Sequence, residues 1–351
     1  MNHAALALIA LALLGAPSLT PLPEGNGIAS LYFGDVGIEA NPAVLFHDDF
    51  ESATNAADLR TKWDAAVHHD AWIRIAEEPA NVNNGRRALE FTVPQQSAEL
   101  ANSVAKAISP EQDVLFIRYY SKFEAGFDQV GSSHNGCSIS AHYFVNGQAT
   151  PGVPADGTNK FLAGFENFRF DPATVKPGLL NVYCYHAEQA TNFGDHFFPS
   201  GTVLPFSSTR SGAATFGPEF VGRPDITPEL DRWYCYELMV KANTVGLRDG
   251  RIACWLDGVL IADFMNIRFR DIDSIKIDRA QIGLHIGSNV NRVNKKWYDD
   301  VVVATSYIGP MAMSPSGSGG GSGGCGASTK TGPLTLVLLA VAFVVVLRRS
   351  R

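Results

Sequence analysis

The sequence predicts an all-β domain, a β-sandwich of two antiparallel sheets, and three observations support this prediction. Short runs in which apolar and polar residues alternate recur along residues 43–310. Gly, Asn, Asp and Pro separate these runs, as they do in hairpins and loops. Strong helical periodicity is hard to find in this part of the chain. A stretch of this length is enough for one large domain.

The predicted strands are segments in which β-branched and aromatic residues are frequent. In chain order they are VLFHDDF (44–50), RRALEFTV (86–93), VLFIRYYSKF (114–123), SISAHYFV (138–145), LLNVYCYHA (179–187), RWYCYELMVKA (232–242), RIACWL (251–256), VLIADF (259–264), AQIGLHIG (280–287) and WYDDVVVAT (297–305). Asp257-Gly258 between two of them predicts a type I′ hairpin, and Asn146-Gly147 is a weaker hairpin signal. Residues 188–230 are rich in Gly and Pro, so we expect long loops beside a binding face.

Alternation within the strands predicts which side chains share a face. In residues 114–123 one face is apolar, and the opposite face carries Arg118, Tyr120 and Lys122. In residues 232–242 the face opposite the apolar one carries Trp233, Glu237 and Lys241. Trp255, in the strand 251–256, is expected on the same side. The sequence therefore predicts one open sheet surface with aromatic side chains among fixed charges.

The first residues of the chain have the pattern of a secretion signal. AALALIALALLG (4–15) is an apolar block of signal-peptide length, shorter than a membrane span, and Ala16-Pro17-Ser18 is a plausible cleavage site. At the other end, a Gly/Ser-rich stretch with Cys325 precedes an apolar run that ends in arginines. We therefore expect an exported protein held at the cell surface or outer envelope.

The tail resembles the C-terminal sorting tags of the myxosortase type through Gly324, Cys325 and Gly326, the apolar run and the basic end. This resemblance implies a sortase-like processing protease as partner, with Cys325 as the processing or lipid-attachment point. A simple single-pass anchor is the alternative, and both interpretations attach the domain to a membrane or cell envelope. The predicted divisions are 1–18 signal peptide, 19–42 N-terminal linker, 43–310 β-sandwich, 311–332 Gly/Ser-rich linker with Cys325, and 333–351 apolar sorting or anchor segment with a basic tail.

Charge and cysteine content narrow the partners and the redox state. A net charge of −7 without a long charge run argues against nucleic acid as a partner. With Cys325 assigned to the tail, the domain has an even number of cysteines, which permits disulfides in an exported protein. Buried free thiols are the alternative. The four residues are Cys137, Cys184, Cys235 and Cys254.

Several stretches resemble the concanavalin A-like jelly rolls, specifically their polysaccharide lyase-like members. They are LFHDDFES, LFIRYYSKFEAGFD, WYCYELMVKAN followed by DGRIACWLDGVLIADF, and WYDDVVVATSYIG. The resemblance implies a concanavalin A-like β-sandwich with polysaccharide as its partner. It also implies β-elimination of a uronic acid-containing polymer as the activity.

β-Elimination requires a cation for the carboxylate, a base for the C5 proton and an acid for the leaving oxygen. In that order, the candidates are Arg118 or Lys122, then His134, His142 or Lys122, then Tyr120 or Tyr185. Asp195, His196 and nearby His186 are expected in a loop beside this site. Hydrolysis would need two carboxylates, and only Glu237 faces the predicted surface.

Binding without catalysis is the alternative function, either as a carbohydrate-binding module or as a structural surface module. Trp233 and Trp255 could stack on sugar rings, while Glu237 and Lys241 could bond hydroxyl groups. Related jelly rolls often join their first and last strands through a cation, which suggests structural Ca²⁺. Its predicted ligands are Asp48, Asp49, Glu51 and Asp300, and simple surface exposure of these acids is the alternative.

Overall fold

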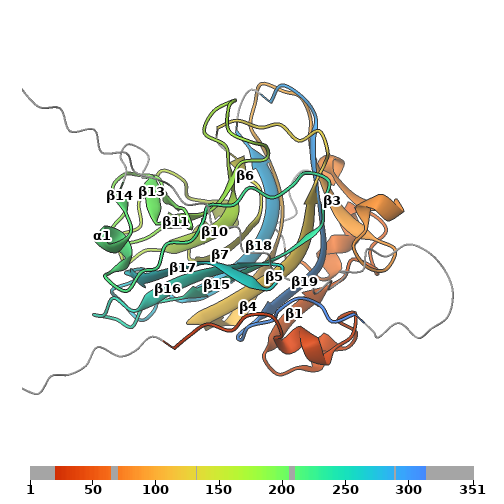
Figure 1. The fold of residues 1–351 in the computed structure, drawn as a ribbon. Coiled ribbons are helices and arrows are strands. Elements are labelled where there is room, and N and C mark those ends of the chain that lie inside the picture. The colour runs from red at the N-terminus through yellow and green to blue at the C-terminus, as the bar shows by residue number, and fades with distance from the viewer. Residues whose placement is uncertain (1–19, 65–69, 132, 205–209, 288–289, 314–351) are drawn as a thin grey trace, which may run out of the picture. The chain divides into compact units, whose positions relative to one another are not determined.

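The computed structural model describes residues 20–64, 70–131, 133–204, 210–287 and 290–313, and two large antiparallel sheets dominate them (Figure 1). This confirms the predicted all-β class with two antiparallel sheets. The predicted signal peptide, Cys325 and the predicted anchor segment lie outside the described residues. No helix within the described residues is long and apolar enough to cross a membrane.

The first sheet has eight strands in the spatial order β17-β16-β15-β5-β19-β3-β2, and β1 pairs with β19 beside this path. Its strands are β1 (Val44–Asp48), β2 (Ile73–Ala76), β3 (Ala88–Val93), β5 (Val114–Phe123), β15 (Tyr234–Lys241), β16 (Gly250–Leu256), β17 (Val259–Ile267) and β19 (Asn294–Ala304). The chain ends of the domain therefore meet in this sheet, because its first strand pairs with its last.

The second sheet has nine strands in the order β14-β13-β12-β11-β10-β7-β18-β4, and β6 pairs with β18. Its strands are β4 (Leu100–Gln112), β6 (Ser133–His134), β7 (Cys137–Ala141), β10 (Phe161–Phe168), β11 (Leu179–Tyr185), β12 (Asp195–Phe197), β13 (Thr202–Leu204), β14 (Arg210–Ser211) and β18 (Ile277–Ile286). Three of them lie within residues 188–230, where loops were expected, so this segment extends the sheet instead.

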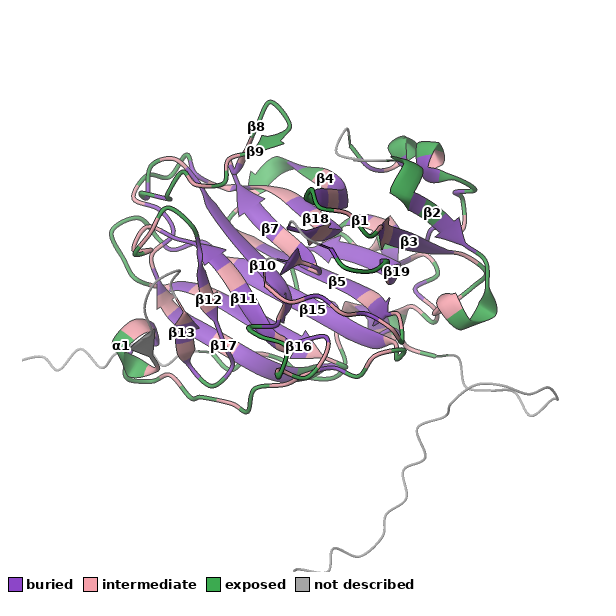
Figure 2. Cartoon of the chain, turned by 90° about the horizontal axis from the view of Figure 1, so that it is seen from above, coloured by how far each residue is buried: buried purple, intermediate pink, exposed green. Residues whose placement is uncertain are grey.

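Short elements precede the first strand or lie between the strands of the two sheets. The hairpin of β8 (Phe144–Val145) and β9 (Gln148–Ala149) stands apart from both sheets (Figure 2). The helical elements are η1 (Ile28–Leu31), η2 (Ile38–Ala40), η3 (Ala56–Thr61), η4 (Asp70–Trp72), η5 (Pro79–Asn81) and α1 (Ala213–Phe216). Both predicted hairpin turns are confirmed, since Asp257, Gly258, Asn146 and Gly147 all have positive φ.

The core lies between the facing sides of the two sheets, where one large apolar cluster joins residues of both. The inward directions predicted for β5 and β15 are confirmed: Ile117 and Leu238 are fully buried in this cluster. Tyr119 of β5 stacks on Tyr236 of β15 at 5.3 Å between ring centroids. Phe165 of β10 meets Tyr236 edge-on at 5.8 Å, which links the second sheet to the first.

The cysteines of the domain are buried free thiols, so the predicted disulfides are not formed and the alternative is correct. Cys137 and Cys184 lie in different strands of the second sheet, and Cys235 and Cys254 lie in the first sheet. Burial raises the pKa of Cys137 to about 12. The thiol therefore stays protonated at neutral pH and behaves as a small apolar core side chain.

Candidate functional site

The surface predicted on the first sheet is covered in the structure, which corrects its interpretation as an open sugar-binding face. Apolar residues of the segments 28–38 and 307–308 pack against the outer side of β5, β15 and β16. Arg118 has no exposed side chain and forms a buried ion pair with Asp35. Trp255 is 1% exposed, and its indole N–H donates to the carbonyl of Pro23 at 2.8 Å.

Two further residues of that predicted surface bind the backbone of residues 308–311, where the covering segment continues. The Tyr120 hydroxyl accepts a hydrogen bond from the N–H of Met311 at 2.9 Å. The Glu237 carboxylate accepts the N–H groups of Ile308 and Gly309, each at 2.8 Å. Burial raises the pKa of Glu237 to about 7, against the opposing effect of these two hydrogen bonds. In the structure both side chains hold the covering segment in place.

The remaining predicted residues of the first sheet are also engaged within the protein. The Lys122 ammonium donates to the Ala80 carbonyl at 2.5 Å and to Asp231 at 3.0 Å. It lies 6.0 Å from the centre of the half-buried Trp233 ring. Lys241 pairs with Asp249 at 3.3 Å. The Lys122 and Lys241 ammonium groups are therefore bonded to groups of the protein itself and stabilise the fold.

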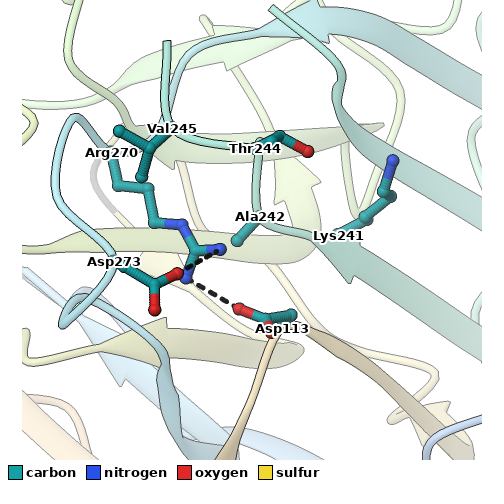
Figure 3. A pocket seen from close by; sticks show the side chains of 7 residues that line it. All are labelled: Asp113, Lys241, Ala242, Thr244, Val245, Arg270 and Asp273. Carbon is teal, nitrogen blue, oxygen red and sulfur yellow. Dashed lines mark ion pairs between the residues drawn. The ribbon is translucent and has the colours of Figure 1, made fainter. Parts of the chain in front are cut away.

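Lys241 also lines a shallow pocket of about 390 Å³ at the ends of β4, β5 and β15 (Figure 3). Arg270 lies in this pocket with 4% of its surface exposed. Its guanidinium donates to the carbonyl groups of Asn243 and Ile275 and pairs with Asp113 at 2.7 Å. Because Lys241 and Arg270 both pair with carboxylates of the protein, we interpret the charged groups of this pocket as a structural ion-pair network.

The outer face of the second sheet carries a different cluster, which we call the ring row: His285, His134, Tyr183 and His196. Successive ring centroids are 5.3, 4.8 and 5.0 Å apart. Strand pairing places them, because His134 lies opposite His285 in the β6–β18 pair and Tyr183 lies opposite His196 in the β11–β12 pair. Four titratable rings therefore form one continuous line across the sheet.

His134 is held by a buried carboxylate. Its Nδ1 lies 2.9 Å from Oε2 of Glu166, whose side chain is 3% exposed, whereas that of His134 is 42% exposed. Burial acts to lower the pKa of His134, but the charge and hydrogen bond of Glu166 outweigh it, and the pKa lies above its usual value. The pair therefore keeps a proton at His134 to higher pH than a free histidine would.

His196 has the opposite protonation state. Asn181 donates through Nδ2 to the carbonyl of Glu166 at 3.2 Å, so its Oδ1 accepts from Nδ1 of His196 at 2.8 Å. Burial and the nearby charge of His134 lower the pKa of His196 to about 3. His196 is therefore neutral at neutral pH, with the proton on Nδ1 and a free lone pair on Nε2.

Tyr183 lies between the two histidines and keeps its proton. Its hydroxyl accepts the N–H of Gly194 at 3.1 Å, and burial raises the pKa of Tyr183 above its usual value. The position next to Tyr183 in β10 is Gly164, which lies opposite Ser138 of β7 on its other side. A Cβ added at this position would lie 3.6 Å from Oε2 of Glu166, so the glycine lies beneath the carboxylate that holds His134.

Three of the predicted catalytic residues belong to the second sheet, but the structure brings only one of them into the ring row. His134 is a member of the row. Tyr185 shares the face of Tyr183 but is fully buried beneath Tyr143, at 5.1 Å between ring centroids. His142 lies at the end of β7, 3.3 Å from Glu111, and is not among the residues that contact the row.

The predicted calcium ligands are already bound by N–H donors. Asp48 accepts from Lys62 at 2.8 Å and from Trp63 at 2.6 Å, and Asp300 accepts from the amide of Asn83 at 3.0 Å. Asp49 and Glu51 accept backbone N–H groups. Within the described residues, no three acidic, histidine or cysteine side chains are grouped to hold a metal. Calcium binding stays a prediction for a metal-binding experiment to test.

Other residues of the site were missed, although the sequence held a signal for them. Alternation in residues 179–187 places Asn181 and Tyr183 on one face, and alternation in 280–287 does the same for Gln281 and His285. Glu166 had no such signal, because β10 was not predicted as a strand. Alternation shows which residues share a face, but it does not show which face of which sheet stays uncovered in the folded protein.

Comparison with known proteins identifies the fold. No family model and no curated protein sequence matches this chain. Among solved structures, the alginate lyase Aly36B is 17% identical with a TM-score of 0.55, and the match covers 76% of this chain and 98% of that one. The PL-14 alginate lyase from Aplysia kurodai is 13% identical with a TM-score of 0.51, covering 75% and 99%. The chain therefore shares its β-sandwich with polysaccharide lyases, as the sequence resemblance predicted.

Aly36B has also been solved, as a variant, in complex with an alginate trisaccharide; that structure has a TM-score of 0.54 to this chain at 16% identity. At these identities the likeness establishes the fold alone.

Proposed function

We propose that this protein is a polysaccharide lyase that cleaves a uronate polymer by β-elimination at the ring row. One observation carries the proposal: the rings of His196, Tyr183 and His134 lie in contact on one sheet face, and Oε2 of Glu166 lies 2.9 Å from Nδ1 of His134. We assign His196 as the base, Tyr183 as the acid and protonated His134 as the cation. The shared fold with alginate lyases supports the proposal.

In this reaction each of the three groups has a defined task. Nε2 of His196 removes the C5 proton, and the electron pair of the C5–H bond forms the C4–C5 double bond. The C4–O bond breaks, and the leaving oxygen takes the proton of the Tyr183 hydroxyl. Protonated His134 stabilises the negative charge that develops on the sugar carboxylate, and Glu166 keeps His134 protonated. The proton count balances, since one proton is taken and one is given.

Export is part of the proposal. A protein at the cell surface or outer envelope, as the two ends of the sequence predict, would meet polymers that are too large to enter a cell. Solvent reaches the ring row at His134, whose side chain is 42% exposed.

The test is the unsaturated product of elimination, which absorbs ultraviolet light. The full chain should form it from at least one uronate polymer, and Tyr183→Phe should lower kcat by about 10²- to 10⁴-fold. Tyr32→Phe is the matched control, because Tyr32 lies in the N-terminal segment near η1, and it should leave kcat unchanged. Retention on the polymer without product would favour a binding module. Absence of product from every uronate polymer would overturn the proposal.

A further inference from the structure

The outer face of the second sheet carries an arginine, Arg279, and two nitrogens of its guanidinium group have no hydrogen-bond acceptor among the described residues. Arg279 of β18 is half-buried, and its guanidinium carbon lies 4.1 Å from the ring centre of Phe144 in the β8–β9 hairpin. Its Nε and Nη2 are enclosed, and neither has a hydrogen-bond acceptor among the described residues. A buried charged donor without an acceptor is unfavourable, so this arrangement needs an explanation.

Other arginines of the chain show what this edge binds. Arg251 donates from Nε and Nη2 to the two oxygens of Asp263, both at 2.7 Å. Arg268 uses the same two nitrogens for the two oxygens of Asp271. This is the bidentate geometry in which arginine recognises a carboxylate. Arg279 presents the same edge, and Asp278 and Asp64 are near enough to interact with its charge, but no carboxylate of the described residues accepts a hydrogen bond from Nε or Nη2.

A second buried polar group without a hydrogen-bond partner among the described residues lies next to Arg279 on β18. Oε1 of Gln281 is buried and has no hydrogen-bond donor among the described residues. The two residues are two positions apart on β18 and so share a face, about 7 Å from each other. Ser140 and Ser138 of β7 lie opposite them, in that order. One group lacks an acceptor with negative charge, and the other lacks a donor.

We propose that Arg279 and Gln281 form a subsite for one uronosyl unit of the polymer. The sugar carboxylate binds Nε and Nη2 of Arg279, and a sugar hydroxyl donates to Oε1 of Gln281. This inference rests on the proposed function for the identity of the polymer. A uronic acid is the sugar class that carries both groups, since a neutral sugar has no carboxylate.

The subsite is separate from the point of cleavage. β18 lies three strands from β11, which carries Tyr183, and three strand spacings span about 14 Å. The unit bound there is therefore not the cleaved sugar but another unit of the same polymer chain. Because Nε and Nη2 are enclosed, the β8–β9 hairpin with Phe144 has to shift when the carboxylate enters. A polymer of contiguous uronates is then preferred over one with isolated uronates.

The test measures binding rather than cleavage, so it is independent of the reaction. A uronate tetrasaccharide is titrated into the full chain carrying Tyr183→Phe, and the same sugar with its carboxyl groups reduced is the neutral probe. Adding Arg279→Gln should weaken uronate binding about 10- to 100-fold and leave the neutral probe unchanged. Arg279→Lys should lose part of the affinity, because lysine keeps the charge but not the paired donors. The control, Arg86→Gln, changes an arginine that is 84% exposed and should have no effect.

Three results would overturn the subsite: unchanged uronate affinity in Arg279→Gln, equal losses for the charged and the neutral probe, or no uronate binding by the parent protein. Gln281→Leu gives a second measurement, with an expected loss for both probes because both retain hydroxyl groups. If Tyr183→Phe does not fold, His196→Gln provides the same inactive background. Failure of the proposed function is a distinct result, because an intact subsite would still bind uronate in a protein that forms no unsaturated product.

Discussion

Replacing Glu166 with Gln should shift the pH dependence of the reaction while keeping its reacting groups in place. Glu166 is buried beneath His134 and accepts from Nδ1 at 2.9 Å. Its charge and hydrogen bond hold the pKa of His134 above the usual value, despite the opposing effect of burial. Gln has nearly the same size and can still accept this hydrogen bond, so the substitution removes mainly the charge.

The strength of this charge interaction follows from the distance and the exposure. Two unit charges about 2.9 Å apart interact by about 1.4 kcal/mol in water and by about 6 kcal/mol at an effective dielectric constant of 20. The His134 side chain is 42% exposed, so solvent screens the pair and the lower figure applies. Glu166→Gln removes this charge interaction, so the pKa of His134 should fall.

His134 is proposed to act while protonated, so activity is lost as pH rises through its pKa. In Glu166→Gln the alkaline limb of kcat/KM should lie at lower pH than in the parent protein. Proton NMR of the imidazole gives the same pKa without reference to activity. Glu111→Gln is the matched control, because Glu111 lies 3.3 Å from His142, outside the ring row, and should leave the limb in place. An unmoved or raised His134 pKa in Glu166→Gln would refute the reasoning.

Three further predictions test the site and the covering segment. His196→Gln should lower kcat by about 10²- to 10⁴-fold in the product assay, and unchanged kcat would exclude His196 as the base. Asp35→Ala leaves the Arg118 guanidinium buried without its ion-pair partner, so urea unfolding should show a loss of about 3–5 kcal/mol. Asp35→Ala combined with Arg118→Met should recover much of it. The pKa of Glu237 is raised from 4.5 to about 7 in the folded protein, so its stabilising contribution is complete below pH 4.5 and is lost as pH rises through 7. Wild type should therefore lose up to about 3 kcal/mol more than Glu237→Gln between these pH values, and parallel stability curves would contradict this.

Strands with strong local signals could be predicted from the sequence, and strands without them could not. β5 has the predicted bounds, 114–123, because VLFIRYYSKF alternates regularly and is rich in β-branched and aromatic residues. β4, Leu100–Gln112, is the longest strand, yet its Ala, Ser, Asn and Lys residues have weak strand propensity. It forms because it pairs along nearly the whole of β18. Such long-range pairing has no signature in a local window.

For the site, too, alternation predicted which way side chains point but not which surface stays exposed. Alternation predicted correctly that Arg118 and Glu237 point away from the core between the sheets. It could not predict that residues near 28–38 and 307–308 would cover them, because a sheet with two covered faces and a sheet with one open face share the same alternation. His134 was a candidate from its residue type alone, whereas its carboxylate partner, Glu166, came from a strand that was not predicted.

The sequence by itself determined the class of the fold, the hairpin at Asp257-Gly258, the inward residues of the regular strands and the kind of chemistry to look for. Each of these depends on residues that are neighbours along the chain. Only the tertiary structure decided which sheet face is open and which four rings meet on it. His134, Tyr183, His196 and His285 come from four strands, β6, β11, β12 and β18, and their contacts arise from strand pairing and sheet packing between distant parts of the chain. Local propensity carries no information about that proximity, so the site became visible only when the strands were placed side by side.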